Sequence, residues 1–195
     1  MRLDALAEHV SGCPARLRGS RVVCIDGRAG AGKTSLAAEL AAFLEPVGPV
    51  SIVHLDDLYE GWSGLPGVVH HVVDQLVDPW AAGEPASLAA WDWHRDVRRD
   101  PVPLELTPVV LLEGVGSWSR RIEDAVSTLV WVECDEPTRR RRARSRDGGV
   151  LDLRWESWAA DELLVHEREQ TPIRADVVID TGRSRSARQR EVPAP

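Results

Sequence analysis

One octapeptide, GRAGAGKT at residues 27–34, combines three glycines with the only lysine of the chain, Lys33. The other 23 residues counted with lysine are arginines, so composition alone would place arginine here. The spacing satisfies G-x-x-x-x-G-K-[ST], in which glycines let the backbone curl so that successive N–H groups face phosphate oxygens. A compact ammonium fits inside such a loop, whereas a wide planar guanidinium does not. The octapeptide therefore predicts a phosphate-binding loop.

The residues of this loop have separate predicted roles in binding ATP and Mg²⁺. Lys33 is expected to reach the β- and γ-phosphates, and the Thr34 hydroxyl is expected to bind Mg²⁺. The helix that begins near Lys33 adds the positive end of its dipole. The predicted nucleotide contacts are Gly27, Arg28, Ala29, Gly30, Ala31, Gly32, Lys33, Thr34 and Ser35.

The composition is that of an ordinary globular protein. The 195 residues are 43% hydrophobic and 28% charged, and the net charge of −7 argues against a nucleic-acid-binding face. No apolar run approaches the roughly 18 residues of a membrane span, and the acidic N-terminal segment is unlike a signal peptide. Cys13, Cys24 and Cys134 form no CxxC pair and are expected to be reduced thiols. We therefore expect a cytoplasmic protein that binds neither nucleic acid nor membrane.

Five short apolar runs alternate with helix-forming stretches. They lie at residues 21–26, 50–55, 109–114, 128–134 and 176–180. The runs are nearly continuously apolar, as in parallel strands covered on both faces. The alternation predicts an α/β fold of the P-loop NTPase type, a three-layer sandwich with a five-stranded, mostly parallel sheet.

One domain is expected over residues 1–182, followed by a polar tail, residues 183–195, that is predicted to be disordered. An insertion at residues 60–108 is rich in Trp, Pro, Gly and His. It is predicted to be helical around residues 68–82 and otherwise irregular. Long insertions at the ends of parallel strands commonly bind substrate, so the acceptor site is expected there.

Three further expectations concern the core. The helical spacing of residues 155–169 predicts a shared face made of Trp155, Trp158, Ala159, Leu163 and His166. His54, in a strand-like run, is expected to be a core residue. The adjacent pair His70 and His71 has no third ligand at suitable spacing, so no metal site is predicted there.

The motifs after the loop point to a class of enzyme. The chain has no asparagine and no second lysine, which excludes the N-K-x-D motif of guanine-reading GTPases. HLDDLYEGW at residues 54–62 resembles the D-[DS]-F-[YF] motif of the uridine kinase group of P-loop kinases. LLEG at 111–114, the T-R-x-x-R-x-x-x-R-D pattern at 138–147 and ADVVI at 175–179 resemble further motifs of that group. The group includes nucleoside kinases, nicotinamide riboside kinase and, more remotely, phosphoribulokinase.

This resemblance implies roles for the acidic residues. Asp56 would act on the acceptor hydroxyl, with Asp57 as the alternative base. The Mg²⁺ site would be formed by Thr34, Glu113 and Asp56. Leu58 departs from the phenylalanine of the group but keeps the position apolar. The expected substrate contacts are Asp57, Tyr59, Trp62, Asp92 and Trp93.

The arginine-rich stretch is expected to be a lid over residues 136–150. Arg139, Arg142 and Arg146 are spaced i, i+3 and i+7, so they share one face of a helix. The resemblance implies that this face closes on the phosphates and stabilises their charge during transfer. The alternatives are a solvated helix and a nucleic-acid patch.

Together these features predict an ATP-dependent kinase that phosphorylates a hydroxyl of a nucleoside, uridine- or cytidine-like, or of a related metabolite. The alternative is a P-loop regulatory protein or ATPase without a small-molecule acceptor. A nucleic-acid end kinase is a third class, which the acidic net charge opposes. The acceptor, the choice between ATP and GTP, and the oligomeric state stay open, with a homodimer among the alternatives.

Overall fold

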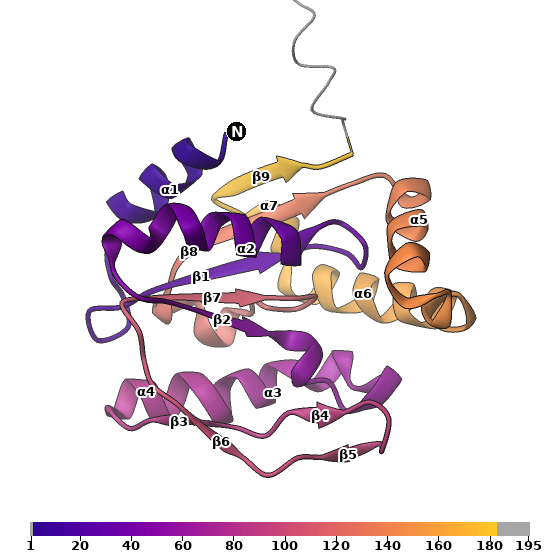
Figure 1. Ribbon diagram of the computed structural model, residues 1–195, viewed down its shortest axis with the longest axis horizontal. Helices are drawn as coiled ribbons and strands as arrows, with labels where there is room; N and C mark the ends of the chain where they lie inside the picture. Colours follow the sequence, from indigo (N-terminus) through magenta and orange to yellow (C-terminus); the bar gives the residue numbers. More distant parts are fainter. Residues whose placement is uncertain (1, 183–195) are drawn as a thin grey trace, which may run out of the picture.

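The computed structural model describes residues 2–182, and the tail predicted to be disordered lies outside this range. Five strands form one sheet in the order β2-β7-β1-β8-β9, and every neighbouring pair is parallel. The strands are β1 (Arg21–Asp26), β2 (Val50–His54), β7 (Val109–Glu113), β8 (Val126–Glu133) and β9 (Val177–Asp180). Their carboxyl ends point to one edge of the sheet (Figure 1). The predicted fold class is confirmed.

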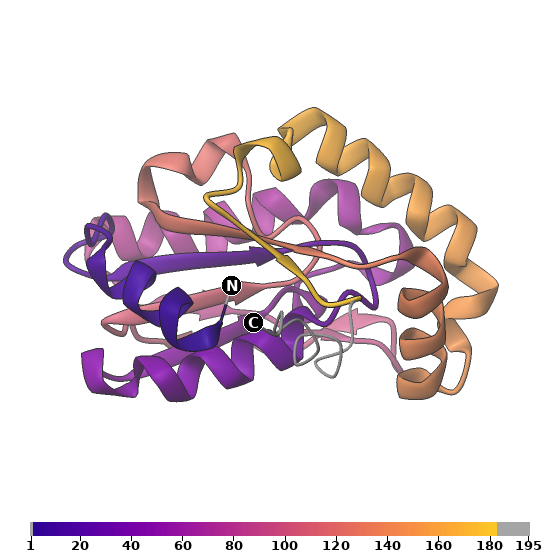
Figure 2. The same ribbon diagram turned by 90° about the horizontal axis from the view of Figure 1, so that it is seen from above.

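Helices cover both faces of this sheet, which explains why its strands are continuously apolar. Val23 and Ile25 of β1 pack towards α1 (Leu3–Gly12) and α2 (Lys33–Leu44). Their neighbours in the same strand, Val22 and Cys24, face the opposite core. That core is closed by the helices of the insertion and by α6 (Trp155–Glu169). Figure 2 shows α1 and α2 on one side of the sheet and α6 on the other.

The insertion is more regular than expected. The predicted helical segment around residues 68–82 is confirmed as α3 (Val68–Val72), a π-helical turn (Val73–Val77) and α4 (Asp78–Ala82). The expectation of irregular structure elsewhere is wrong, because β3 (Ala86–Leu88) pairs with β6 (Val102–Leu104) and β4 (Trp91–Asp92) pairs with β5 (Val97–Arg98), both antiparallel. These strands are two or three residues long, too short to leave an alternating pattern in the sequence.

Three helices lie between β8 and β9. The arginine-rich stretch forms α5 (Glu136–Asp147), and the carboxylate of Asp135 caps it by accepting from the Thr138 N–H at 2.9 Å. A 3₁₀ turn (Val150–Arg154) then leads into α6, and α7 (Thr171–Arg174) precedes β9. Further 3₁₀ turns lie at Glu45–Val47, Leu55–Asp57, Gly61–Ser63, Leu65–Gly67 and Arg120–Ala125. Within residues 2–182, no helix has both the length and the apolar character of a membrane span.

The buried face of α6 differs from the predicted one. Trp155, Trp158 and His166 are buried as expected, but Leu163 is 46% exposed. Two acidic residues, Glu162 and Glu169, are buried in its place, at 1% and 8% exposure. The prediction for Leu163 is wrong because hydrophobicity alone chose the face, whereas hydrogen bonds across the interface bury the two carboxylates.

Candidate active site

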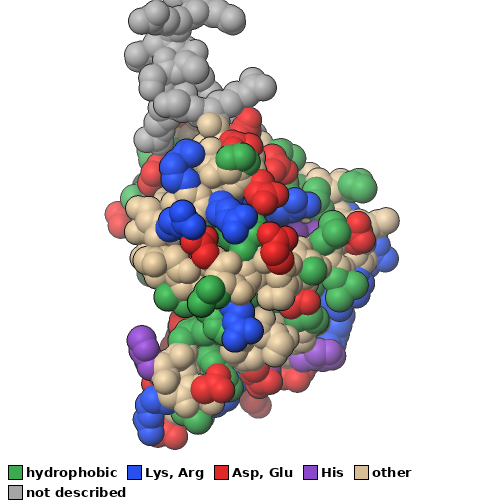
Figure 3. Space-filling model, turned by 90° about the vertical axis from the view of Figure 1, so that its right-hand side faces the viewer, with side chains coloured by type: hydrophobic (Ala, Val, Ile, Leu, Met, Phe, Trp, Pro, Cys, Tyr) green, Lys and Arg blue, Asp and Glu red, His purple; other side chains and the backbone are tan. Residues whose placement is uncertain are grey.

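The carboxyl edge of the sheet brings together the motifs that the sequence separates. The phosphate loop, residues 27–34, connects β1 to α2, and the turn that holds Asp56 follows β2. Glu113 ends the neighbouring strand β7, and α5 follows β8. Figure 3 views this edge, where basic and acidic side chains gather in the upper half of the face. Ligands of open parallel sheets bind at this edge.

Glycine is required in the phosphate loop for two reasons, the backbone conformation and the lack of space for a side chain. Gly27, Gly30 and Gly32 have φ values of +148°, +76° and +99°, a region that L side chains rarely adopt. A Cβ on Gly27 would lie 2.4 Å from the Val132 carbonyl oxygen. One on Gly30 would lie 2.2 Å from the carbonyl oxygen of Arg139 in α5. The loop therefore curls tightly against both β8 and α5.

Lys33 lies inside this curl, with only 8% of its surface exposed. Its Nζ donates to the carbonyl oxygens of Gly27 at 2.8 Å and Arg28 at 3.2 Å. These two acceptors hold the ammonium in the loop without neutralising its charge. The positive charge is thus fixed where phosphate oxygens are predicted to bind.

Some backbone N–H groups of the loop donate to acidic side chains, and others have no acceptor within the described residues. The Gly27 N–H donates to the Asp26 carboxylate at 2.7 Å, and the Ala29 N–H donates to Glu162 at 2.6 Å. Within the described chain, the N–H groups of Gly30, Gly32, Lys33 and Thr34 have no protein acceptor. Unpaired N–H groups at a helix N-terminus form an anion site, so the loop fits a nucleotide phosphate chain.

Two of the three residues predicted to hold Mg²⁺, Thr34 and Glu113, lie in contact, and the third, Asp56, is exposed on the turn after β2. Thr34 Oγ1 donates to Glu113 Oε1 at 3.1 Å, so two oxygen donors of the kind that Mg²⁺ prefers are adjacent. Residues 2–182 contain no group of three or more His, Cys, Asp or Glu able to hold a metal. Mg²⁺ in phosphoryl-transfer sites takes one or two protein ligands, and substrate phosphates and water supply the rest. The pair therefore fits Mg²⁺ bound with a nucleotide.

His54 contacts the carboxylate of Glu113, so it is not the core residue that was expected. Its Nδ1 lies 2.5 Å from Glu113 Oε1, and its side chain is 44% exposed. The last residue of β2 stands beside the last residue of β7 in register, which places the imidazole on the carboxylate. The two motifs, at residues 54–57 and 111–114, are far apart in the sequence, so only the pairing of the strands reveals the contact.

The acidic turn after β2 is held by its main chain and leaves its side chains accessible. Asp56 is exposed, and Asp57 is half-buried. Burial raises the pKa of Asp57 above its ordinary 3.8; nearby His54 opposes this shift and the Asp56 carboxylate adds to it. Trp93 Nε1 donates to the Asp56 carbonyl at 2.9 Å, and Arg98 donates to the carbonyls of Asp57 and Leu58. The hairpin of β4 and β5 thus fixes the turn.

The expected substrate contacts differ in how accessible their side chains are. Tyr59 is 1% exposed, its hydroxyl donates to the Val115 carbonyl at 2.8 Å, and burial raises its pKa. Its side chain therefore has no free surface for a substrate in this structure. Trp62 and Trp93 form an edge-to-face pair with centroids 5.1 Å apart, and Trp93 is 37% exposed. Asp92 closes the hairpin by accepting from the N–H groups of His94 and Arg95.

The lid arginines make contacts of two kinds, with backbone carbonyls or with an acidic side chain. Arg139 is 3% exposed and donates to the Ala29 carbonyl at 3.1 Å. Arg142 donates to the carbonyls of Ala31 and Thr181. Arg146 is exposed on α5, with Asp147 at 3.6 Å. The first two therefore hold the phosphate loop and its surroundings, whereas Arg146 is accessible from solvent.

Two buried acidic residues at this edge, Asp26 and Glu162, are absent from the expected site. Asp26 ends β1 and accepts from the N–H groups of Gly27 and Gly116 and from His166 Nε2 at 3.1 Å. Glu162 accepts from Ala29 in the loop. The available signals were an acidic residue at the end of an apolar strand and an acidic residue within the tryptophan face of a helix. Neither indicates its partner without the fold.

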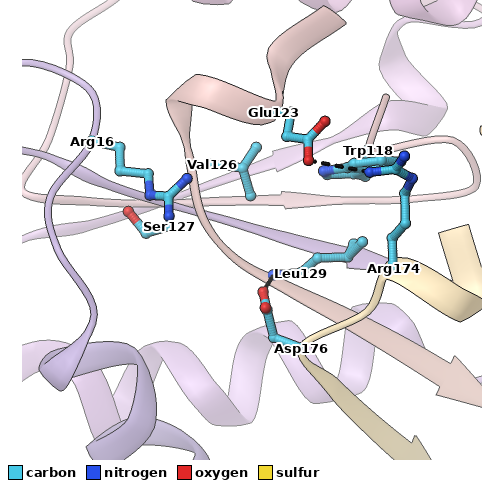
Figure 4. A pocket seen from close by; sticks show the side chains of 8 residues that line it. All are labelled: Arg16, Trp118, Glu123, Val126, Ser127, Leu129, Arg174 and Asp176. Atoms are coloured by element: carbon cyan, nitrogen blue, oxygen red, sulfur yellow. Dashed lines mark hydrogen bonds and ion pairs between the residues drawn. The ribbon is translucent and has the colours of Figure 1, made fainter. Parts of the chain in front are cut away.

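A separate cavity of about 320 Å³ lies at the opposite, amino ends of β8 and β9. Its polar groups are largely paired: Arg174 contacts Glu123 at 3.2 Å, and Asp176 accepts from the Leu129 N–H (Figure 4). It shares no residue with the loop, the acidic turn or α5, so it is not part of the candidate site.

Comparisons with known proteins show where this fold recurs. No family model and no curated protein match the sequence. A possible uridine kinase from Bacillus stearothermophilus matches with a TM-score of 0.67 and 22% identity, over 91% of this chain and 97% of that chain. A protein assigned as a fructose transport system kinase from a Silicibacter species matches with a TM-score of 0.62 and 20% identity, covering 92% and 99%. The chain therefore shares the overall fold of these two structures.

Proposed function

We propose that the protein is a cytoplasmic kinase, dependent on ATP and Mg²⁺, that phosphorylates a hydroxyl of a nucleoside or a related small metabolite. The observation that carries the proposal is the meeting of three features at one sheet edge. These are the phosphate loop around Lys33, the Thr34–Glu113 pair and the accessible carboxylate of Asp56. An ATPase or regulatory protein needs the first two features, whereas the third suits an acceptor hydroxyl.

In the proposed reaction each residue acts from its observed position. ATP supplies the phosphoryl group, and bound Mg²⁺ neutralises developing charge. The loop N–H groups and Lys33 hold the phosphates, and Thr34 and Glu113 hold the metal. Asp56 accepts the proton of the acceptor hydroxyl as its oxygen bonds to phosphorus and the bond to ADP breaks. Of the three lid arginines, Arg146 is the one exposed to solvent, and it would approach the phosphates from there.

A flat acceptor of the uridine or cytidine type is supported by the aromatic surface beside the acidic turn. Trp93 is partly exposed and hydrogen-bonded to the Asp56 carbonyl, so one residue joins an aromatic face to the proposed base. Aromatic side chains stack well on planar rings. Trp62, edge-on to Trp93, fixes the orientation of that ring.

The test is a screen for phosphorylated products. The protein is incubated with ATP, Mg²⁺ and a panel of nucleosides and sugars, and products are identified by mass spectrometry. We expect at least one acceptor-dependent product with the wild type. Asp56→Asn should lower its rate by about a hundred-fold or more, the usual contribution of a general base. Asp100→Asn, exposed in the same insertion, should leave the rate unchanged.

Three results would contradict or change the proposal. ATP hydrolysis that is independent of every acceptor would favour the ATPase alternative. Normal turnover by Asp56→Asn together with loss of turnover by Asp57→Asn would move the base to Asp57. Normal turnover by both variants would remove the acidic turn from the chemistry.

A further inference from the structure

The buried acid Glu162 binds directly to the phosphate loop. Glu162 lies on α6 and is 1% exposed. Its Oε1 accepts from the Ala29 N–H at 2.6 Å and from the indole Nε1 of Trp158 at 3.0 Å. Burying a carboxylate is costly unless its oxygens are paired, so these contacts account for an acid at a core position of this helix.

One rigid peptide plane connects Glu162 to Lys33. The Ala29 N–H and the Arg28 carbonyl belong to the same planar amide. The carbonyl end accepts from Lys33 Nζ at 3.2 Å and from the Ala31 N–H at 3.1 Å, while the N–H end donates to Glu162. Because the amide cannot flex, the carboxylate at one end sets the position of the lysine acceptor at the other.

The next peptide plane is fixed in the same way from α5. The Ala29 carbonyl accepts from Arg139 Nη1 at 3.1 Å, and its amide partner is the Gly30 N–H. In a trans amide the N–H points opposite to the carbonyl, so the Gly30 N–H is directed away from the Arg139 guanidinium. Arg139 also lies 3.9 Å from Glu162 Oε2, which balances the buried charge.

We propose that Glu162 is a positioning residue of the nucleotide site, acting through the Arg28–Ala29 peptide on Lys33 and, together with Arg139, on the Gly30 N–H. The predicted effect on ATP affinity rests on the proposed nucleotide binding. The contacts of Glu162 with the loop are those of the free protein and do not depend on it. The carboxylate of α6 holds the loop in its phosphate-binding shape before nucleotide arrives. This preorganisation lowers the ordering cost of binding.

The experiment compares Glu162→Ala, Glu162→Gln and the matched control Glu167→Ala, which alters an exposed acid of the same helix. Amide hydrogen exchange is measured by mass spectrometry in the free protein, for peptides covering residues 27–35 and Val109–Glu113. The dissociation constant of ATP with Mg²⁺ is measured by calorimetry. Urea unfolding confirms that each variant is folded.

We expect loop exchange in Glu162→Ala to be about ten-fold faster and ATP binding to be about ten-fold weaker, as for loss of a hydrogen bond to a charged group. Exchange of the β7 peptide should not change. In Glu162→Gln the amide oxygen can still accept from Ala29, so loop exchange should return close to wild type. A purely structural role would not restrict the effect to the loop.

Loop exchange in Glu162→Ala equal to wild type would overturn the proposal, as would faster exchange with unchanged ATP affinity. If Glu162→Ala does not fold, Glu162→Asp decides, because its shorter side chain withdraws the carboxylate from Ala29: faster loop exchange supports the proposal and unchanged exchange overturns it. A wild type that binds no ATP refutes the proposed function, and exchange in the free protein still judges the contact of Glu162 with the loop.

Discussion

Lys33 shows how local chemistry overrides composition at a single position. Its ammonium is nearly buried and is held by two carbonyl oxygens. The other 23 residues counted together with this lysine are all arginines. A guanidinium is planar, wider and donates in a fixed fork, so it cannot occupy a curl closed by the carbonyls of consecutive residues. The requirement comes from the size of the loop and not from charge alone.

The single lysine gives a direct test of the nucleotide site. An acylating probe delivered by ATP should label Lys33, because the chain has no other side-chain amine, and excess ATP should protect it. Peptide mass spectrometry measures the labelling. Lys33→Arg provides the control, since it has no lysine to label. Labelling of Lys33 that ATP does not reduce would argue against phosphate binding at the loop.

His71, in the insertion, should make stability depend on pH. Burial lowers its pKa below 6.5; Arg98 and His70 act in the same direction, and Glu60 and Asp74 oppose them. The native state therefore favours neutral His71, and its contribution to stability is full above about pH 6.5 and is lost as pH falls towards the lowered pKa. Urea midpoints at about pH 8 and about pH 5.5 should differ less in His71→Asn than in wild type. Exposed His94→Asn is the control, and an equal change with pH in both variants would contradict the prediction.

At the scale of elements, the phosphate loop and α5 fit against each other through Gly30. Its φ of +76° and the 2.2 Å approach of an added Cβ to the Arg139 carbonyl leave no place for a side chain. Gly30→Ala should therefore lower the free energy of unfolding by about 1–3 kcal/mol and weaken ATP binding. Gly12→Ala, in α1 with open space around the added Cβ, should leave stability equal or slightly higher. Equal urea curves for Gly30→Ala and wild type would show that the loop and α5 separate easily.

The β4–β5 hairpin should tune the acidic turn through one indole N–H. Trp93→Phe keeps an aromatic ring beside Trp62 but removes the donor to the Asp56 carbonyl. We expect kcat for the acceptor reaction to fall about ten-fold while KM for ATP is unchanged, because the phosphate loop is untouched. Steady-state kinetics measure both constants, with His94→Asn as the control at the exposed tip. A change confined to KM for ATP would contradict this role.

Sequence patterns predicted the elements better than the contacts between them. The strand at residues 21–26 and the helix at 155–169 have the predicted bounds, because long apolar or helical periods define them. The short strands of the insertion were not predicted, because they are defined by hydrogen bonds to a neighbouring strand and not by a periodic sequence pattern. Glu162 was missed for a related reason: its partner, Ala29, is 133 residues away, and no local pattern encodes that distance.

For the whole molecule, the strand order decides which motifs become neighbours. β7 lies between β1 and β2 in the sheet, although the whole insertion separates it from β2 in the sequence. This order places Glu113 beside both Thr34 and His54. The sequence could predict that the loop and Glu113 lie at one edge, because parallel strands share their carboxyl ends. It could not predict which strands are adjacent.

Asp26 ties together three distant parts of the chain, so its removal should affect the whole molecule. Its carboxylate is fully buried and accepts from Gly27 and Gly116 of two strand-end loops and from His166 of α6. Asp26→Ala leaves several buried donors unpaired, each at about 1–3 kcal/mol, so we expect a loss of more than about 3 kcal/mol in the free energy of unfolding. Asp26→Asn retains one acceptor oxygen and should lose less, whereas Asp100→Ala, at an exposed site, should lose nothing. Urea unfolding measures all three. A loss below about 1 kcal/mol in Asp26→Ala would mean that water replaces the carboxylate and that the three segments are held by packing alone.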